Sequence, residues 1–545
     1  MSMYLFFSFV IAMFVTMVLI PPLKARAAQL KFIDLPDPRK VHTTPIPRIG
    51  GIAMVIGVLI PVILWARGAE EMVGYVFGAA TILVFGVWDD RANLHYRAKF
   101  GGQIIAVAVL VFGGGVVIEH VPFLDDALPL WAGIPLTFIA LLGITNAINL
   151  ADGLDGLAGG TTLITLAAIS LMAYNAGDLR LMLLALAVMG SIVGFLRFNT
   201  HPAQIFMGDG GSQFLGFSTG VLAIILTQQS NPALSPAMPL LLLGLPIIDT
   251  FIVMGQRISE RRSPFSPDKN HIHHKLLGLG FDHYEAVVII YLVQTLLVGT
   301  AVAFRFHADL WNMMVFAFVF LSAIAAFPVA AGLRWRIRAR QSADAPSRLT
   351  QFIVRVRKTE VLARYPYQFI ALTLPCFAIL TEFSAGPQSA DVVALALIFS
   401  ALMIGLAVLQ SAEGLNFLER GGVYLAITLV AYSSEIRSDA LHHTLLENAY
   451  FVLLTVAVVF SFRFSSLKEI DITPLDFLVV LLALTVPNMP GLDIPIDLFG
   501  VLVGKIFVMF YAAEVLINSK YTRPSRVRLG TALVLASIAL PVLLG

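Results

Sequence analysis

The sequence has little charge for its length. Asp, Glu, Lys and Arg make up only 13% of the 545 residues, whereas hydrophobic residues make up 58%. A soluble domain carries about 25% charged residues, so the composition excludes an ordinary soluble protein and predicts an integral membrane protein. The formal net charge of +2 gives no indication of a nucleic acid partner, and we expect none.

Cysteine is nearly absent, and two common catalytic motifs are missing. Cys376 is the single cysteine, which excludes an intramolecular disulfide and a cysteine-rich metal site. Its place in an apolar run predicts a small buried residue. The sequence contains neither a GxxxxGK[ST] loop nor a GxSxG turn, so we expect neither a P-loop ATPase nor an α/β-hydrolase.

Long apolar runs are what the sequence does have. Runs of about 16 to 22 residues are near the length that crosses a bilayer as a helix, and the backbone of such runs is satisfied in helices rather than in barrel strands. We therefore predict an all-α, polytopic membrane bundle of about 18 transmembrane helices. The spans are expected to begin near residues 3, 49, 72, 100, 130, 159, 180, 212, 237, 284, 311, 368, 391, 422, 447, 475, 498 and 529. The first run has no cleavage site after it and is predicted to remain as a helix.

The basic residues indicate the orientation in the membrane. Segments 24–48, 256–283, 334–367 and 518–528 are rich in Lys and Arg, and all four follow odd-numbered spans. Connections on the other side, such as EFSAGPQSAD, have almost no basic residues. The positive-inside rule therefore predicts an outside N-terminus and cytoplasmic basic loops.

The arginine-rich segment predicts a division of the chain. We expect a first membrane domain over residues 1–335 with about 11 spans, a basic cytoplasmic linker over 336–367, and a C-terminal membrane module over 368–545 with about 7 spans. Every dense polar motif precedes the linker. The second module carries scattered charges such as Lys505 and Glu514, which could pair within a bundle. We interpret it as an accessory or dimerising bundle; handling a lipid-linked product and docking a partner are the alternatives.

Five polar, glycine-rich loops are predicted on the cytoplasmic side. They are RKVHTTPIPRIGG (39–51), WDDRANLHYRAKF (88–100), NLADGLDGLAGG (149–160), NTHPAQIFMGDGGS (199–212) and PDKNHIHHKLLGLG (267–280). Asn149, Asp152 and Asp155 are three residues apart, so a helical segment would place all three near one face. Loops of this kind on one side of a bundle indicate a site open to the cytosol.

Acidic and amide side chains in these loops suit a hard cation. Asp89 and Asp90 are a metal-binding pair, a general base and its neighbour, or a solvated pair at a helix end. Asp209 lies between glycines that let the backbone approach a ligand closely. Together, Asn149, Asp152, Asp155 and Asp209 offer oxygen ligands for Mg²⁺ or Mn²⁺ rather than zinc.

Cationic side chains accompany the carboxylates. The candidates for binding phosphate oxygens are Arg48, Lys99, His271, His273, His274 and Lys275. Cationic neighbours disfavour a zinc site at HIHH. Carboxylates with Mg²⁺ opposite Lys and His are typical of phosphoryl transfer. Asp249, which lies inside an apolar run, is predicted to be a structural partner of a lysine or histidine, with a supporting role behind the site as the alternative.

In their order and loop positions, these motifs resemble those of the polyprenyl-phosphate N-acetylhexosamine-1-phosphate transferases. The resemblance rests on the Asp pair with a lysine ten residues after Asp89, NAINLADGLDGLAGG, FMGDGGS and NHIHHKL, and it covers about residues 1–335. It implies transfer of a sugar-1-phosphate from a UDP-sugar to undecaprenyl phosphate with release of UMP. It also implies a bacterial inner membrane enzyme that begins a cell-surface polysaccharide such as O-antigen, with its site on the cytoplasmic face. Two mechanisms stay open: direct attack by the lipid phosphate, and transfer through an aspartyl intermediate.

The resemblance also implies roles for single residues. Asp89, Asp90 and Asp209 are the expected catalytic residues, and the Asp89–Asp90 pair orients or deprotonates the lipid phosphate. Asn149 and Asp209 are the expected Mg²⁺ contacts, with Mn²⁺ as the alternative ion. Asp155 and Phe206 are expected at the uracil, where the phenyl ring can stack, and Asp152 at the ribose and diphosphate. The remaining expected substrate-binding residues are Lys99, Asn146, His271, His273 and His274.

The histidine motif bears on the choice of donor. HIHH resembles the form found in enzymes that take UDP-N-acetylglucosamine, which we expect as the donor; another UDP-hexosamine is the alternative. A transporter of lipid or sugar intermediates is the main competing class, and it predicts ionisable residues near the bilayer midplane. The clustering of carboxylates at span ends favours the enzyme. A homodimer is among the expected partners.

Overall fold

The structure is a computed structural model of the 545-residue chain. It describes residues 3–36, 44–66, 68–92, 94–263, 270–332, 361–384, 390–408, 416–436, 441–464, 496–517 and 524–540. Contacts within the chain divide it into two compact units, the first with helices α1 to α13 and the second with helices α15 to α21.

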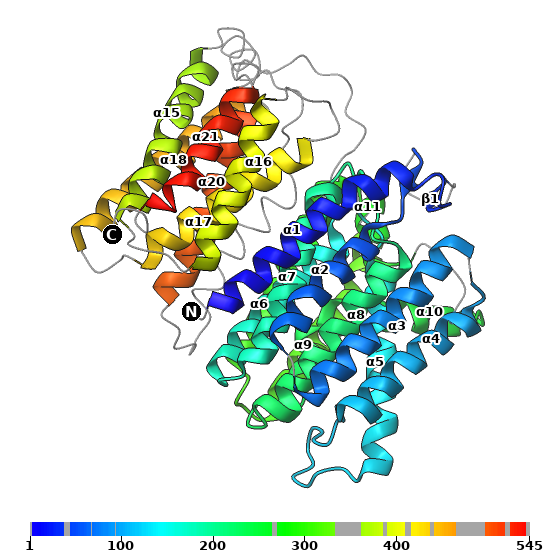
Figure 1. The fold of residues 1–545 in the computed structure, drawn as a ribbon. Coiled ribbons are helices and arrows are strands. Elements are labelled where there is room, and N and C mark those ends of the chain that lie inside the picture. The colour runs from blue at the N-terminus through cyan, green and yellow to red at the C-terminus, as the bar shows by residue number, and fades with distance from the viewer. Residues whose placement is uncertain are drawn as a thin grey trace. The chain divides into compact units, whose positions relative to one another are not determined.

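The first unit is a helical bundle with one short β-ribbon (Figure 1). Its longer helices are α1 (Met3–Arg26), α2 (Gly50–Trp65), α3 (Glu70–Ala92), α4 (Tyr96–Ala108), α5 (Leu130–Ala151), α6 (Leu157–Asn175), α7 (Leu179–Asn199), α8 (Gly208–Ile225), α10 (Gly244–Ser259), α12 (His283–Ala303) and α13 (Asp309–Gly332). The shorter elements are η1 (Val109–Gly113), η2 (Leu226–Ser230), α9 (Met238–Leu242), α11 (Ile272–Gly278), β1 (Ile33–Asp34) and β2 (Ile46–Pro47).

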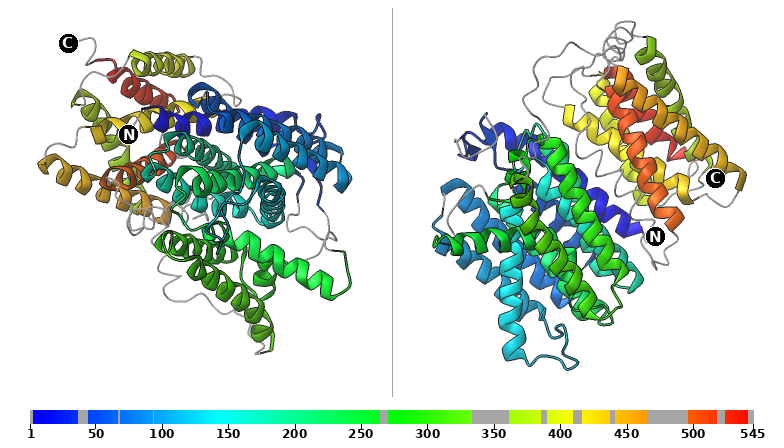
Figure 2. Two further views of the ribbon diagram at one scale, coloured as in Figure 1. Left: turned by 90° about the horizontal axis from the view of Figure 1, so that it is seen from below. Right: turned by 180° about the vertical axis from the view of Figure 1, so that it is seen from behind.

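The second unit is a separate bundle, whose helices lie alongside one another in both views of Figure 2. Its described helices are α15 (Val361–Ser384), α16 (Ala390–Val408), α17 (Asn416–Ile436), α18 (Leu441–Phe464), α20 (Ile496–Ile517) and α21 (Pro524–Ser537). Lys505 and Glu514 do pair inside this bundle, but not with each other. Lys505 forms an ion pair with Glu447 at 2.8 Å, and Glu514 accepts a hydrogen bond from Tyr424.

The predicted all-α membrane bundle is confirmed, whereas the predicted number of spans is not. A helix begins within seven residues of each predicted start, the largest difference being α15 at Val361 against 368. The exception is the start near 475, which lies outside the described residues. Among the described residues, nine helices are long and apolar enough to cross a membrane. The span expected near 237 is broken into α9 and α10 at Leu243. The predicted boundary near 335 and most of the predicted linker also lie outside the described residues, and α15 begins at Val361.

One prediction about a single residue is wrong. Cys376 is exposed on α15 rather than buried. An apolar environment on a membrane helix does not have to be the protein interior, because lipid is as apolar as a packed core.

Helix α8 is the centre of the first unit. Every residue of α8 except Asp209 is buried, compared with 6% of the most apolar stretch of α13. Figure 1 shows α8 between α7 and α3, and it also packs against α2 and α5. Glycines allow this: a Cβ at Gly86 of α3 would overlap Gly210, and one at Gly51 of α2 would overlap Gly211. The start of α8 is therefore in backbone contact with two neighbouring helices.

The loop before α2 is fixed against the loop before α8. β1 and β2 pair antiparallel, with Asp34 opposite Ile46. The following residues reach the second loop, where Phe206 N donates to Pro47 O at 2.7 Å and Gly50 N donates to Phe206 O at 2.9 Å. Two sequence motifs that are 150 residues apart thus form one surface.

Candidate active site

Two helices bring together an acidic cluster, which we define as Asp89, Asp90 and Asp209. Asp89 and Asp90 lie in the last turn of α3, and Asp209 lies in the first turn of α8. The close approach of Gly86 to Gly210, one turn from these residues, sets this arrangement. The predicted catalytic carboxylates are therefore neighbours in space, although 119 residues separate Asp90 from Asp209.

Asp90 holds the beginning of α8. Its Oδ1 accepts a hydrogen bond from Asp209 N at 2.8 Å, and its Oδ2 accepts one from Gly210 N at 3.2 Å. The first N–H groups of a helix have no partner inside the helix and carry a partial positive charge. A carboxylate on a second helix satisfies two of them here, so Asp90 fixes the position of Asp209.

Lys99 of α4 connects the other two carboxylates. Its Nζ lies 2.8 Å from Asp89 Oδ2 and also forms an ion pair with Asp209. Asp89 Oδ1 accepts a hydrogen bond from Leu94 N at 2.8 Å. The Asp89 side chain is buried, whereas that of Asp209 is 34% exposed. Asp209 therefore keeps part of its side chain open to a ligand.

Asp152 lies close enough to the acidic cluster for the charges of Asp209 and Asp90 to affect its pKa. Burial, followed by the negative charges of Asp209, Asp155 and Asp90, raises the pKa of Asp152 to about 7. Carboxylates raise the pKa of a neighbour only where they share a region of low screening. The negative charges of these three carboxylates therefore add to the effect of burial at Asp152.

The expected single helical face for Asn149, Asp152 and Asp155 is not found. α5 ends at Ala151, so Asn149 lies in its last turn and Asp152 caps its C-terminus with non-helical dihedral angles. Asp155 follows in the turn before α6, where Gly156 has a positive φ of 79°. The helix ends because a left-handed glycine and the loop contacts of Asp155 replace the next helical turn.

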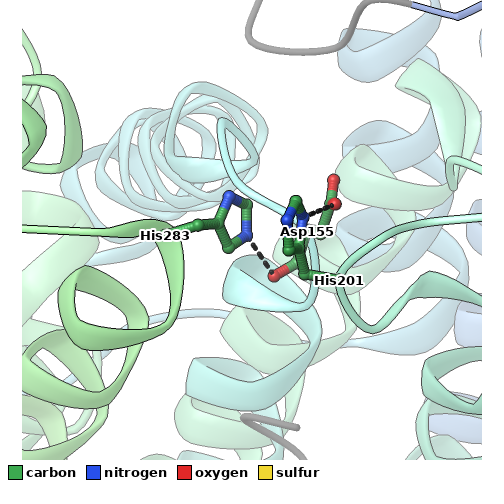
Figure 3. Close-up of side chains that lie close together, drawn as sticks. All are labelled: Asp155, His201 and His283. Atoms are coloured by element: carbon green, nitrogen blue, oxygen red, sulfur yellow. Dashed lines mark hydrogen bonds and ion pairs between the residues drawn. The ribbon is translucent and has the colours of Figure 1, made fainter. Parts of the chain in front are cut away.

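Asp155 is held by two histidines that sequence reasoning did not assign (Figure 3). Its Oδ2 lies 2.6 Å from His201 Nδ1 and accepts a hydrogen bond from Ala203 N at 3.0 Å. His283 stacks on His201 with ring centroids 4.0 Å apart, and its Nε2 lies 3.4 Å from Asp155 O. The presence of His201 in NTHPAQIFMGDGGS was the available signal, because a histidine in a polar motif is a candidate partner for a carboxylate.

This cluster of Asp155, His201 and His283 does not have the geometry of a metal centre. Its ligand atoms lie within 4.8 Å of one another. The two imidazole planes are only 18° apart, however, so their nitrogen lone pairs run side by side. A metal ion needs lone pairs that converge on one point. The cluster is a hydrogen-bonded connection among the loops before α6, α8 and α12.

Asn146 belongs to a chain of amides. Its Nδ2 donates to Gln103 Oε1 at 2.8 Å, and Gln103 Nε2 donates to Gln213 Oε1 at 3.0 Å. The chain joins α5, α4 and α8 just inside the acidic cluster. Sequence reasoning missed Gln103 and Gln213, since a glutamine in an apolar run carries no motif.

The histidine loop is fixed by the aspartate predicted to support it. Asp249 of α10 accepts a hydrogen bond from Ile272 N at 2.8 Å and lies 2.7 Å from His271 Nδ1. Both Asp249 and His271 are buried. The predicted structural pairing of Asp249 with a histidine is therefore found, and it sets the start of α11.

His273 lies against the loop of Asp152. A Cβ added to Gly153 would overlap the His273 imidazole, so only glycine fits there. Burial and the charge of His274 lower the pKa of His273 to about 3, and its Nε2 is buried without a hydrogen-bond partner among the described residues. A neutral His273 can bind a sugar or phosphate oxygen through a hydrogen bond, but not as a cation.

Two other predicted phosphate-binding cations have partners of their own. Arg48 forms an ion pair with Asp34, and Lys275 lies over the ring of Phe327 at 5.4 Å. Phe206 is half-buried next to Arg48, with which it forms a parallel bridge. Of the predicted cations, Lys99 is the one that contacts the acidic cluster.

The donor set fits a hard divalent cation. Asp209 and Asp152 offer carboxylate oxygens and Asn149 offers an amide oxygen, the ligand types that Mg²⁺ prefers. Burial contributes most to the raised pKa of Asp152, and the neighbouring carboxylates add to it. These donor types fit a hard divalent cation at the end of the bundle where the acidic cluster lies.

Comparison with known proteins identifies the family. The model of glycosyl transferase family 4 matches residues 72–227, which include the acidic cluster and Lys99. A Bacillus subtilis (strain 168) protein named probable undecaprenyl-phosphate N-acetylglucosaminyl 1-phosphate transferase is 37% identical over 318 residues, 58% of this chain and 88% of the relative. The chain belongs to glycosyl transferase family 4.

Two further relatives carry related names. Decaprenyl-phosphate N-acetylglucosaminephosphotransferase of Mycobacterium tuberculosis (strain ATCC 25618 / H37Rv) is 35% identical over 310 residues, 50% of this chain and 75% of the relative. Undecaprenyl-phosphate alpha-N-acetylglucosaminyl 1-phosphate transferase of Escherichia coli (strain K12) is 28% identical over 299 residues, 53% of this chain and 81% of the relative. This coverage agrees with a C-terminal extension beyond the matching region.

Proposed function

We propose that this protein transfers N-acetylglucosamine-1-phosphate from UDP-N-acetylglucosamine to undecaprenyl phosphate and releases UMP. The observation that carries the proposal is the acidic cluster: Asp89 and Asp209 share Lys99, while Asp90 fixes the start of α8. The names of the relatives support the sugar phosphate and the polyprenyl phosphate. The donor nucleotide and the leaving group follow from the resemblance of the motifs.

The reaction exchanges one phosphorus–oxygen bond for another. An oxygen of the lipid phosphate attacks the β-phosphorus of the nucleotide sugar, and the bond from that phosphorus to the bridging oxygen breaks. The bridging oxygen leaves with UMP, and the lipid carries a diphosphate joined to the sugar. Catalysis of such a transfer consists mainly of positioning and charge stabilisation.

The residues of the cluster have distinct proposed roles. Lys99 is placed to bind the phosphate oxygens between Asp89 and Asp209, since an ammonium offers three donors. Asp89 orients or deprotonates the lipid phosphate. Asp90 acts through its hold on the first N–H groups of α8, so it keeps Asp209 in place.

Asn149 and Asp209 would hold Mg²⁺, with Asp152 beside it. A divalent ion held there would supply neutralisation of the charge on the transferring phosphoryl group. This proposal rests on the oxygen donors and on the carboxylates that lie close to Asp152.

The nucleotide and sugar are assigned to the surrounding loops. Asp155 faces the uracil with its Oδ2 held by His201 and Ala203, and Phe206 supplies a ring for stacking. His271, His273 and His274 contact the sugar or its phosphate, with His273 as a neutral hydrogen-bonding group. Asn146 supports this region through its amide pair with Gln103.

The proposed orientation places the site on the cytoplasmic face of a bacterial inner membrane, with the N-terminus outside. Basic segments after odd-numbered spans support this orientation. The lipid acceptor explains the location of the site, because a polyprenyl chain can stay in the bilayer while its phosphate reaches the acidic cluster.

The deciding experiment uses the purified full-length protein. Radiolabelled UDP-N-acetylglucosamine and undecaprenyl phosphate are supplied with Mg²⁺, and lipid-linked label and UMP are both quantified. We expect equal amounts of the two products. Lipid-linked product from another UDP-hexosamine alone would change the donor, whereas absence of product from every UDP-hexosamine would refute the proposed reaction.

A further inference from the structure

The second unit contains a cavity that the proposed reaction does not use. Its volume is about 310 Å³, and α15, α17, α20 and α21 line it. All of these helices belong to the second unit. The volume is at the lower end of the range of about 300 to 1,000 Å³ for small-molecule sites, which suits one slender chain rather than a pair of chains.

The wall of this cavity is apolar over most of its length. It follows α15 from Tyr367 to Ala378, eleven residue steps that span about 16 Å of helix. Small residues keep it open, and a Cβ at Gly530 would meet no atom within 4 Å. Thr531, one of its few polar residues, already donates its hydroxyl to Val527 O at 2.9 Å. The wall therefore offers contacts to hydrocarbon and little to a polar ligand.

One end of the cavity is cationic. Arg526 is the one charged residue that lines it, and it lies in the first turn of α21. Among the described residues, no carboxylate forms an ion pair with Arg526. Arg528, by contrast, is buried. It forms an ion pair with Glu419 at 2.8 Å and donates a hydrogen bond to Leu406 O at 2.7 Å. The bundle neutralises Arg528 internally and leaves Arg526 exposed at the cavity.

The predicted topology places this charged end at the membrane surface. α21 begins within the basic segment 518–528, and α15 begins within the basic segment 334–367, both predicted to be cytoplasmic. Tyr367 and Arg526 are near the beginnings of these two helices. An apolar cavity with a cation at the surface end matches an amphiphile with one chain and an anionic headgroup.

We propose that this cavity binds a polyprenyl phosphate, with its isoprenoid chain along α15 and α21 and its phosphate at Arg526. The choice among single-chain lipid phosphates rests on the proposed function, in which such a lipid is the acceptor. The second unit then provides a second binding place for the acceptor lipid, separate from the acidic cluster.

The test is photolabelling of the full-length protein in nanodiscs without a nucleotide sugar. The probe is a polyprenyl phosphate with a diazirine in its first isoprene units, and labelled peptides are mapped by mass spectrometry. We expect label in residues 509–516 and 526–534, and excess undecaprenyl phosphate should compete for it. Equal competition by phosphatidylglycerol, or by undecaprenol, would overturn the proposal.

Two pairs of variants make the test specific. Gly530→Leu fills the cavity, and Gly405→Leu is its control, because Gly405 of α16 also has open space around it and lies outside the cavity. Arg526→Gln removes the charge, and Arg26→Gln at the exposed end of α1 removes one elsewhere. Each cavity variant should lower labelling of the second unit about tenfold, and each control should not. Unchanged labelling in both cavity variants would overturn the proposal.

The photolabelling result can be distinguished from the result of the transfer assay that tests the proposed function. Labelling needs no turnover, so it tests the cavity even if no sugar is transferred. Transfer without labelling of the second unit would refute this inference alone, whereas labelling of the second unit without transfer would refute the proposed reaction alone.

Discussion

Asp90 and Asp209 have the same side chain and are in direct contact, yet their substitutions should have different effects. Asp90 accepts hydrogen bonds from the N–H groups of Asp209 and Gly210 at 2.8 and 3.2 Å. Asparagine keeps one acceptor oxygen but loses the second bond and the charge. A hydrogen bond to a charged group contributes about 1.5–3 kcal/mol, and a carboxylate at a helix N-terminus about 0.3–1 kcal/mol. Asp90→Asn should therefore lower the stability by about 2–4 kcal/mol.

Asp209→Asn should affect the stability much less. The Asp209 side chain is 34% exposed, and Lys99 keeps its ion pair with Asp89 at 2.8 Å after the change. An ion pair of this exposure contributes up to about 1 kcal/mol. The loss of an oxygen ligand and of negative charge next to the phosphates should nevertheless lower transfer by about a thousandfold.

Thermal unfolding and transfer rates measured on both variants test this separation. Asp90→Asn should lower the apparent Tm by roughly 5–15 °C, at about 2–4 °C per kcal/mol for a large domain, and should also lower transfer. Asp209→Asn should lower transfer while its Tm stays within about 3 °C of the unsubstituted protein. Equal losses of Tm in the two variants would refute the argument that Asp90 holds α8. Full activity of Asp209→Asn would refute its role at the cation.

Three further predictions concern the cation, the histidine loop and the second unit. EDTA should abolish transfer, and Mg²⁺ should restore it and raise the apparent Tm; indifference of both readouts to chelation would refute the magnesium site. Gly153→Ala should lower transfer strongly because its Cβ would overlap His273, while Gly143→Ala on α5, with no atom within 4 Å, should not; equal activities would show that this contact is unimportant. A chain of residues 1–340 should retain transfer when it is correctly folded, and a folded but inactive chain would overturn the accessory interpretation of the second unit.

The positions of the helices could be predicted because apolar runs of membrane length determine them. α5 was expected from residue 130 and begins at Leu130. Its end was not predictable in the same way: the polar residues after Ala151 continue a helical spacing, but the loop contacts of Asp155 with His201 and Ala203 stop the helix. Contacts between distant segments override a local pattern.

The residues of the candidate site could also be predicted from their motifs, whereas their hydrogen-bond partners could not. The motifs single out Asp90 and Asp209, but the hydrogen bonds between them join residues 119 positions apart. The pairing of Asp249 with His271 could be foreseen as a type of contact, since a buried carboxylate needs a partner. The amide chain through Gln103 could not, because glutamine in an apolar run gives no pattern to read.

The backbone contacts of α8 have a consequence for how this enzyme can diversify. Gly86 of α3 meets Gly210, and Gly51 of α2 meets Gly211, so no side chain stands between these helices at the level of the acidic cluster. No rotamer change can alter the spacing of the cluster, and a larger residue at any of these glycines would force helices apart. New donor preferences must therefore arise in the surrounding loops, above all around His271 and His273, while the phosphoryl-transfer centre beneath them keeps a fixed geometry. The close helix contacts thus fix the spacing of the acidic cluster, whereas the loops around it can change without moving these helices.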